Sequence, residues 1–431
     1  MPLRPSSLVA TVSLGLLLLA GAAAPGRAAD PPPSAPPPTL PPNLAAETID
    51  PPALPGALAP RWTESAQGPL LTWLEPWKLT GKKGTKLKGH RLRISRFREG
   101  RWSPPVTVAQ GTRFFANWAD TPGAVEGADR TLYAHWLEKS GAETYDYGIR
   151  LARSRDGGAT WKPLGKLNRD GAKGEHGFVS WLREGANVRA FWVDGRESTM
   201  SASGEHVGAM TLRSAVVSGP EGPIEADIRL DGRICDCCQT GAALGADGPL
   251  VVYRDRSEKE IRDISVIRFT APAWSEPLRL AADGWEIPGC PVNGPAIAAA
   301  GKVVAIAWFT GAAPATRVQA AFSSDGGASF GKPLVLDDGS PLGRVDLVLD
   351  ADGSGVVGWY AFAEEGAALR LRRMRPDGRL GSTATLATTT PARSSGFPRL
   401  LRLGDRLLIT WVDDGSPQRL RAASLPLKSI R

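Results

Sequence analysis

Residues 132–161 read LYAHWLEKSGAETYDYGIRLARSRDGGATW, and the order of segments in this stretch decides the fold. It begins with a short apolar run that ends at Trp136. Residues 147–154 then alternate apolar and polar side chains, as half-buried strands do. A glycine-rich turn follows and ends at Trp161. This order predicts two strands of an antiparallel sheet and a tight hairpin turn into the next strand.

The apolar run recurs along the chain and ends each time in an aromatic residue. The seven ends are Trp73, Trp136, Trp192, Tyr253, Trp308, Trp359 and Trp411, at spacings of 51 to 63 residues. A strand precedes each run, for example 114–119 (FFANWA), an alternating strand follows it, and a fourth strand closes most copies. Repeated four-stranded units predict an all-β propeller. We expect seven blades, with six as the alternative, and a segment before the first copy could complete the last blade.

The turn between the third and fourth strands has a pattern of its own. Residues 154–161 and 323–330 both fit Ser-x-Asp-x-Gly-x-x-aromatic. The aspartates can accept backbone N–H bonds across the turn, the glycines supply positive φ, and the aromatic rings pack back onto the blade. The residues of the pattern are Ser154, Asp156, Gly158 and Trp161 in one copy and Ser323, Asp325, Gly327 and Phe330 in the other.

These turns resemble the Asp-box of the sialidase-like, BNR-repeat propellers of the bacterial secreted type. The resemblance covers roughly residues 61–431 and implies that Asp156 and Asp325 form the fold, away from the active face. It also implies a glycoside hydrolase of the exo-sialidase kind, with three arginines on the substrate carboxylate, a tyrosine nucleophile activated by a glutamate, and an aspartate as acid/base. The family's Arg-Ile-Pro motif is absent, so its catalytic set does not carry over residue by residue.

The N-terminal residues predict export. Residues 1–29 contain Arg4, an apolar stretch and small residues, as a signal peptide does, and residues 30–60 are a proline-rich linker. The domain organisation is therefore signal peptide, linker and a propeller over 61–431. We expect a periplasmic or extracellular protein, with no transmembrane segment once the signal is removed. The net charge of +8 comes from scattered arginines, which argues against a nucleic-acid partner.

In a propeller, the loops that lead into each first strand share one face with the loops that join the second and third strands. Polar residues gather in these loops and predict the binding site. The candidate catalytic residues there are Arg113, Asp120, Tyr145, Arg254, Asp255, Arg256 and Arg344. Other polar residues of the same loops include Tyr147, Glu175, His176, Asn293 and Arg393. The alternating charges of residues 254–263 are also consistent with a solvated, self-paired cluster.

Cysteine is confined to two of these loops, as Cys235, Cys237 and Cys238 in the sequence CDCC and as Cys290 one repeat later. An exported protein favours disulfides. We expect Cys235 to pair with Cys238 or Cys237 and the remaining cysteine to pair with Cys290, as a staple between blades. The alternative is a zinc or copper site that includes His176 or His206. The primary expectation is a protein without a cofactor.

The sequence therefore favours an exported propeller of the sialidase superfamily that acts at its axial face. The ligand would be an acidic glycan or another component of the cell envelope, either cleaved as a sialidase cleaves it or only bound. The alternatives are a non-catalytic interaction propeller and a metal or redox protein that uses the CDCC sequence. We expect a monomer.

Overall fold

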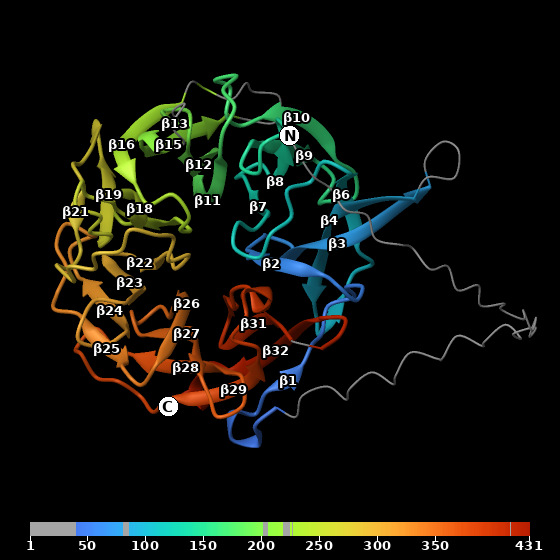
Figure 1. Ribbon diagram of the computed structural model, residues 1–431. Helices are drawn as coiled ribbons and strands as arrows, with labels where there is room; N and C mark the ends of the chain where they lie inside the picture. The colour runs from blue at the N-terminus through green and yellow to red at the C-terminus, as the bar shows by residue number, and fades with distance from the viewer. Residues whose placement is uncertain (1–39, 81–85, 201–205, 219–224, 226, 414) are drawn as a thin grey trace, which may run out of the picture. The chain divides into compact units, whose positions relative to one another are not determined.

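The computed structural model describes residues 40–80, 86–200, 206–218, 225, 227–413 and 415–431. The predicted signal peptide and the first part of the predicted linker lie outside the described residues. Four-stranded antiparallel sheets are arranged around a central axis as the blades of a propeller (Figure 1). The innermost strands contact one another in cyclic order, β2–β7–β11–β17–β22–β26–β30 and back to β2. The prediction of a seven-bladed propeller is confirmed.

The first four blades follow one another along the chain. Blade 1 contains β2 (Leu58–Thr63), β3 (Leu70–Thr80), β4 (Lys86–Arg98) and β6 (Val106–Gly111). Blade 2 contains β7 (Gly123–Glu126), β8 (Leu132–Lys139), β9 (Tyr147–Ser154) and β10 (Lys162–Lys166). Blade 3 contains β11 (His176–Glu184), β12 (Asn187–Asp194), β15 (Met210–Val217) and β16 (Ile228–Ile234). Blade 4 contains β17 (Gly241–Gly245), β18 (Gly248–Arg254), β19 (Ile264–Thr270) and β21 (Leu278–Arg279).

The remaining blades keep the same order except at the end. Blade 5 contains β22 (Ala296–Ala300), β23 (Val303–Thr310), β24 (Arg317–Ser323) and β25 (Leu334–Asp337). Blade 6 contains β26 (Pro341–Leu349), β27 (Gly355–Phe362), β28 (Ala367–Met374) and β29 (Ala384–Thr389). Blade 7 contains β30 (Arg399–Leu403), β31 (Arg406–Val412), β32 (Leu420–Pro426) and, from the N-terminal end, β1 (Glu47–Thr48).

Short elements decorate these sheets. They are β5 (Arg101–Trp102), the hairpin of β13 (Ser198–Met200) and β14 (His206–Gly208), β20 (Ala273–Trp274), and the 3-10 turns η1 (Pro42–Leu44), η3 (Arg393–Ser395) and η4 (Leu427–Ser429). None of the helices in the described part of the chain has the length and apolarity needed to cross a membrane.

The ring is closed by the N-terminal segment, as expected. Strand β1 pairs antiparallel with β32, and Asp50 accepts hydrogen bonds from Ala422 N at 2.9 Å and Arg421 Nη1 at 2.8 Å. Leu44 is buried in the core shared by blades 6 and 7. The compact unit runs from Pro38 to Arg431, so the propeller begins earlier than residue 61. The second half of the predicted linker is part of the fold.

The aromatic residues that end the second strands form the core. Trp73, Trp192, Tyr253, Trp308, Trp359 and Trp411 are fully buried. Several of them donate their polar hydrogen to a carboxylate, as in Trp192 Nε1 to Asp194 at 2.7 Å and Trp359 Nε1 to Asp337 at 2.6 Å. A buried indole N–H usually finds such a partner, although Trp136 Nε1 and Trp411 Nε1 have none among the described residues. In these repeats, the ring of the tryptophan is buried and a hydrogen bond fixes its polar N–H group.

The first strand of blade 2 differs from the prediction. It is β7, Gly123–Glu126, and not residues 114–119. Asn117 accepts hydrogen bonds through Oδ1 from the backbone N–H of Ala119 at 2.8 Å and Asp120 at 2.7 Å. This Asx-type turn ends the pairing with β8, which extends only to the bridge of Phe114 with Glu138 and the hydrogen bond from Phe115 N to Leu137 O. The aromatic side chains of the segment lie instead in the loop before the blade.

Candidate functional site

The two faces of the propeller are distinguished by their turns. In the turn of residues 154–161, Asp156 Oδ1 accepts hydrogen bonds from Ser154 Oγ at 2.7 Å and Thr160 N at 2.9 Å. Asp325 makes the equivalent bonds to Ser323 and Ser329. Arg96 Nη2 donates to Gly157 O at 2.9 Å, so this turn lies beside the hairpin of the first two strands of blade 1. The expected geometry of both turns is present. The face of the propeller on which these turns lie is called the turn face.

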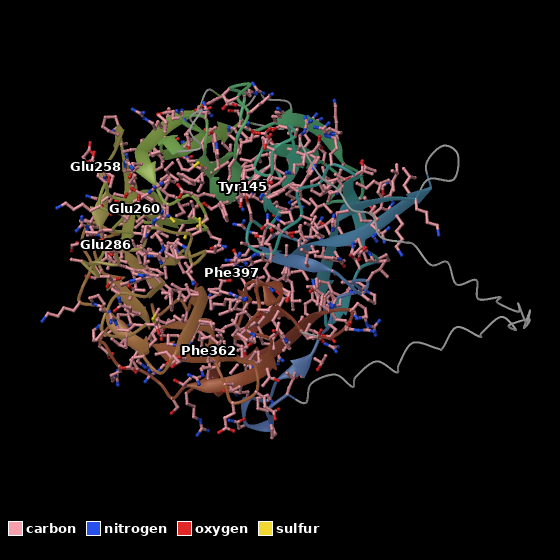
Figure 2. The ribbon with its side chains drawn as sticks, viewed as in Figure 1. Tyr145, Glu258, Glu260, Glu286, Phe362 and Phe397 are labelled. Atoms are coloured by element: carbon pink, nitrogen blue, oxygen red, sulfur yellow. The ribbon has the colours of Figure 1, made fainter. Side chains whose placement is uncertain are left out.

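The opposite face is called here the axial face. It is formed by the loops that lead into the first strands, residues 112–122, 167–175, 235–240, 280–295 and 390–398, and by the loops between second and third strands. Figure 2 shows Phe397 near the axis and Glu258, Glu260 and Glu286 over blade 4. All predicted catalytic residues lie in or beside these loops.

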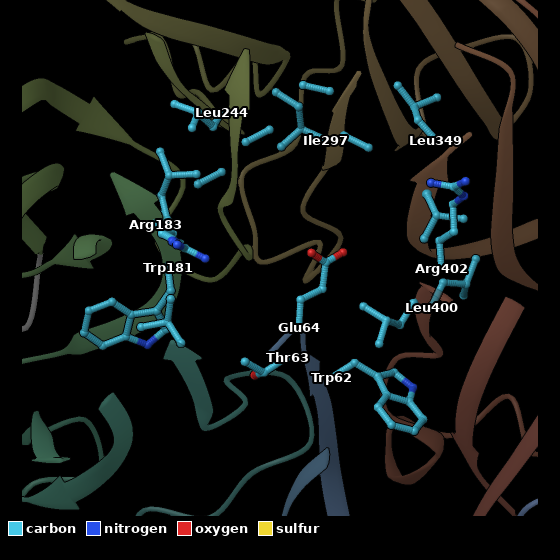
Figure 3. A pocket seen from close by; sticks show the side chains of 18 of the residues that line it. Trp62, Thr63, Glu64, Trp181, Arg183, Leu244, Ile297, Leu349, Leu400 and Arg402 are labelled. Atoms are coloured by element: carbon cyan, nitrogen blue, oxygen red, sulfur yellow. The ribbon is translucent and has the colours of Figure 1, made fainter. Parts of the chain in front are cut away.

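A cavity of about 1070 Å³ opens at the other mouth of the central channel. Its wall combines apolar and polar surface, and Glu64, Arg183 and Arg402 reach it from three blades (Figure 3). Arg402 pairs with Asp350 at 3.2 Å, so charges of both signs are present and balance one another. None of the predicted catalytic residues lines this cavity. We therefore place the candidate site on the axial face, where all the predicted catalytic residues lie.

A tyrosine and a glutamate are hydrogen-bonded beneath this face. Tyr147 Oη donates to Glu175 Oε1 at 2.6 Å, and its ring stacks on Phe115 with centroids 4.0 Å apart. Burial, followed by the charge of Glu175, raises the pKa of Tyr147 well above its usual value. Burial also raises the pKa of Glu175 to about 7. Tyr147 is only 1% exposed, so its hydroxyl is shielded from any ligand on the surface.

Asp120 lies next to this pair. Its Oδ1 accepts a hydrogen bond from Phe178 N at 2.7 Å, whereas its Oδ2 has no partner among the described residues. Burial raises the pKa of Asp120 well above its usual value. A Cβ at Gly177 would lie 1.8 Å from Asp120 Oδ2, so the carboxyl group is packed against backbone. The structure brings Asp120, Tyr147 and Glu175 together, but beneath the surface.

Two of the predicted arginines join neighbouring blades. Arg254 is buried and donates to Asn293 O at 2.7 Å, Phe309 O at 2.7 Å and Arg262 O at 2.5 Å. Its guanidinium also lies 4.8 Å from the ring centre of Trp285. These contacts use its fork of donors on backbone carbonyls and not on the surface. Arg254 thus connects blade 4 to blade 5.

Arg344 has the corresponding position between blades 6 and 7. It is 6% exposed, and its Nη1 donates to Ser395 Oγ at 2.6 Å and Ala392 O at 3.0 Å. These bonds hold the loop that carries η3. Burial, and then the neighbouring charge of Arg393, lowers the pKa of Arg344.

The exposed Arg393 lies beside an aromatic stack. The guanidinium groups of Arg344 and Arg393 are 4.9 Å and 5.9 Å from the ring centre of Trp118, and Trp118 stacks on Phe397 at 5.8 Å. The side chain of Arg393 makes no hydrogen bond or ion pair within the described part of the chain. Two like charges therefore meet at one aromatic ring without a carboxylate. We call Trp118, Arg344, Arg393 and Phe397 the arginine–tryptophan cluster.

The charges of residues 254–263 largely pair with one another. Arg256 contacts Glu260 at 2.7 Å and Asp236 at 2.9 Å, and Arg262 contacts Glu260 at 2.8 Å. Asp255 accepts hydrogen bonds from Arg256 N at 2.7 Å and Ser265 Oγ at 3.0 Å, and burial raises its pKa. This segment is the self-paired cluster that its alternating charges suggest.

Two further candidates lie at the periphery. Arg113 is exposed and donates through Nη2 to Lys139 O at 2.5 Å. Tyr145 is 61% exposed on the loop between β8 and β9. Neither contacts the arginine–tryptophan cluster. The sequence prediction misses Trp118 because it places residues 114–119 in a strand, and it misses Phe397 although this residue lies in the same loop as Arg393. In the sequence, the only indication of a role for Trp118 and Phe397 is that each is an aromatic residue in a loop that contains an arginine.

The four cysteines meet where blades 4 and 5 join, but no disulfide is present. Cys235, Cys237 and Cys238 have their Sγ atoms within 4.8 Å of one another, and Cys290 lies beside Cys237. Cys235 Sγ and Cys238 Sγ are 3.3 Å apart, beyond bonding distance, and all four are free thiols. The predicted proximity of Cys290 is confirmed, whereas the predicted disulfide staple is not observed. Hydrogen bonds from Cys237 and Cys238 and the charge of Arg262 overcome the effect of burial and hold the pKa of Cys235 well below its usual value.

Fold and site together define a seven-bladed β-propeller with an arginine-containing aromatic cluster and a cysteine cluster on its axial face.

No family model matches the chain, and no curated protein is similar to it in sequence. Among solved structures it resembles the polysaccharide lyase Uly1, with a TM-score of 0.51, 8% identity, and coverage of 86% of this chain and 90% of that one. Other similar structures are the alpha-L-arabinanase of Penicillium chrysogenum (TM-score 0.49, 14% identity, 92% and 100% coverage) and the NanB sialidase of Streptococcus pneumoniae (TM-score 0.44, 8% identity, 88% and 94% coverage). At these identities the likeness is one of fold.

Proposed function

We propose that this protein binds acidic glycans at its axial face and is not a hydrolase with a tyrosine nucleophile. The observation that carries the proposal is the exposed Arg393 guanidinium, held beside Trp118 without an anionic partner in the described chain. An arginine presents a planar fork of donors that matches a carboxylate in two hydrogen bonds. Arg344 adds a second positive charge at the same ring. A carboxylated sugar would supply the missing anion.

The aromatic residues of the cluster suit a sugar ring. The half-buried Trp118 stacks on Phe397 and offers an apolar edge next to the cation. Binding sites commonly combine such apolar surface with a few polar groups that fix orientation. A propeller of the same fold is named as a polysaccharide lyase, which also supports a glycan ligand. Export to the periplasm or the cell exterior, where such glycans occur, is part of the proposal.

Hydrolysis of the sialidase kind is the second candidate, favoured by the 2.6 Å hydrogen bond between Tyr147 and Glu175. A nucleophile must reach the anomeric carbon, and Tyr147 is sealed by Phe115. Its raised pKa also disfavours the phenolate. These two facts make binding without turnover the better supported function.

The test is calorimetric titration with sialylated, uronic-acid-containing and neutral oligosaccharides, together with a fluorogenic sialoside. We expect binding of the acidic sugars only, no release of product, and at least tenfold weaker binding by Arg393→Ala. The matched control is Arg379→Ala, which removes an exposed arginine from the turn after β28. Equal binding of acidic and neutral sugars, or full binding by Arg393→Ala, would refute the proposal. Product release that is lost in Tyr147→Phe would favour the hydrolase.

A further inference from the structure

A second site on the axial face uses the four cysteines. Three Sγ atoms from one turn, those of Cys235, Cys237 and Cys238, lie within 4.8 Å of one another. The thiol of Cys290, from the loop before β22, lies beside Cys237. Thiolates are ligands for the soft ions Zn²⁺ and Cu⁺. Three converging thiols and a fourth from the next blade form a complete set of such donors.

The turn that carries three of these cysteines is held rigidly. Cys235 N donates to Arg254 O at 3.0 Å. The buried Gln239 side chain accepts a hydrogen bond from Gly294 N at 3.0 Å and donates to Ala119 O at 3.0 Å. A Cβ at Gly294 would lie 2.2 Å from Gln239 O, so only glycine allows the two loops to approach this closely. The loops of blades 4 and 5 are therefore fixed relative to each other before any ion binds.

The surroundings suit an anionic cluster. Arg262 is 3% exposed and places Nη1 3.3 Å from Cys235 Sγ. An N–H group directed at a ligating sulfur is a common outer-shell contact of thiolate sites. Asp236, in the middle of the CDCC sequence, is already paired with Arg256 at 2.9 Å. Within the described chain, Cys235 is the one cysteine whose sulfur accepts a hydrogen bond from a charged side chain, so the sulfur atoms of Cys237, Cys238 and Cys290 remain available as ligands.

The other group of potential ligands differs in this respect. Asp170, His176 and Asp194 converge, with His176 Nε2 3.0 Å from Asp170 Oδ2. Arg196 already bonds this group, with Nε 2.8 Å from Asp194 Oδ1 and 3.1 Å from Asp170 Oδ2. The guanidinium of Arg196 thus already occupies the position that a metal cation would take. His176 is therefore not a partner of the cysteines, and the side chain of His206 lies outside the described residues.

We propose that Cys235, Cys237, Cys238 and Cys290 bind one soft metal ion, Zn²⁺ or Cu⁺, across the boundary of blades 4 and 5. Tetrahedral Zn²⁺ with Zn–S bonds of about 2.3 Å requires sulfur atoms about 3.8 Å apart. Cys235 Sγ and Cys238 Sγ are 3.3 Å apart, close to this value, and the three sulfur atoms of the turn all lie within 4.8 Å of one another. Cu⁺ would need only the three thiolates of the turn. Cys290 is exposed, so the ion can enter from the axial face.

The test uses the full chain, purified under reducing conditions without chelator and then loaded with Zn²⁺ or Cu⁺. We expect one equivalent of metal per chain by elemental analysis, and intense sulfur-to-metal absorption with Co²⁺ as a probe. Cys235→Ser and Cys238→Ser should each lose the metal. Cys290→Ser should lose Zn²⁺ but keep Cu⁺, which separates four-thiolate from three-thiolate binding.

A second measurement needs no variant. Alkylation of the exposed Cys290 should be at least tenfold slower in the Zn²⁺-loaded protein than in the metal-depleted protein. Less than a tenth of an equivalent of either metal in the reduced wild type would overturn the proposal. Undiminished metal content in a variant with all four cysteines changed to serine would overturn it as well. Two disulfides among the four cysteines of the exported protein would also overturn the proposal.

Discussion

Arg344 donates a 2.6 Å hydrogen bond to Ser395 Oγ, so an arginine of blade 6 fixes the loop from which Arg393 projects. Further donations to Ala392 O and Gly396 O complete the contact. Arg344 is thus a positioning residue for the proposed glycan site.

Arg344→Lys should weaken binding of acidic glycans by at least fivefold and lower the free energy of unfolding by about 1–3 kcal/mol. A lysine keeps the charge but cannot reach several carbonyl oxygens at once. Calorimetric titration and urea unfolding measure the two effects. Arg402→Lys, at the opposite mouth of the channel, is the control. Unchanged affinity in Arg344→Lys would show that Arg393 does not depend on this loop.

Arg254→Met should lower stability by about 3 kcal/mol or more, because the buried carbonyl oxygens of Asn293 and Phe309 each lose a donor. Any loss of glycan binding should follow the loss of folded protein. Chemical unfolding followed by tryptophan fluorescence measures the stability. A variant of normal stability that binds no ligand would instead give Arg254 a direct role.

Asp156→Ala and Asp325→Ala should each reduce stability by about 1–2 kcal/mol and leave axial-face binding unchanged. Each aspartate closes its turn with hydrogen bonds from a serine hydroxyl and a backbone N–H. Hydrogen bonds from Thr160 and then Ser154 lower the pKa of Asp156 to about 2. The stabilisation is therefore present above the ordinary aspartate pKa and is lost as pH falls towards 2. An affinity change in either variant would contradict a purely structural role.

Asp50→Ala should destabilise the protein by about 1–2 kcal/mol, since Asp50 binds both Arg421 and the backbone of β32. Glu47→Ala, in the strand β1 that precedes Asp50, is the matched control. Its carboxylate is exposed and its ion pair with Arg406 should contribute less than about 0.5 kcal/mol. Thermal unfolding compares them. Equal effects would mean that the closing strand is not held by Asp50.

Glu175→Gln should flatten the dependence of stability on pH between about 4.5 and 7. The folded pKa of Glu175 is raised to about 7, chiefly by burial, so the folded state holds a proton that the unfolded state releases near 4.5. Stability is therefore greatest below 4.5 and falls as pH rises through 7. His176, whose pKa is also raised, contributes in the same direction and should remain in the variant. Melting temperatures from pH 4 to 8 measure the slope, and an unchanged slope would exclude Glu175.

The repeat was predictable from sequence because each blade buries one aromatic residue at the end of its second strand, and burial leaves a regular pattern. Closure of the ring followed from the missing fourth strand after Trp411. The loops were less predictable. Asn117 ends the ladder through a side-chain contact that no periodicity reveals, and this displaced Trp118 from a strand to the axial face.

The roles of the arginines could not be read from their positions in the sequence. Arg254 and Arg393 both lie in loops of the axial face, yet one is buried against carbonyl oxygens and the other is exposed. That difference depends on which backbone oxygens the neighbouring blade presents. Likewise, the meeting of Cys290 with the CDCC turn followed from the repeat, whereas the oxidation state of the sulfur atoms did not.

The pairing of β1 with β32 also sets the order of events during synthesis. Glu47 pairs with Ser424, so the first strand must remain without its partner until nearly the whole chain has left the ribosome. At about 5–20 residues per second this interval is on the order of tens of seconds. During it, blade 7 cannot form and the ring stays open. Among the described strands, the last one to be made is therefore the one that completes the ring.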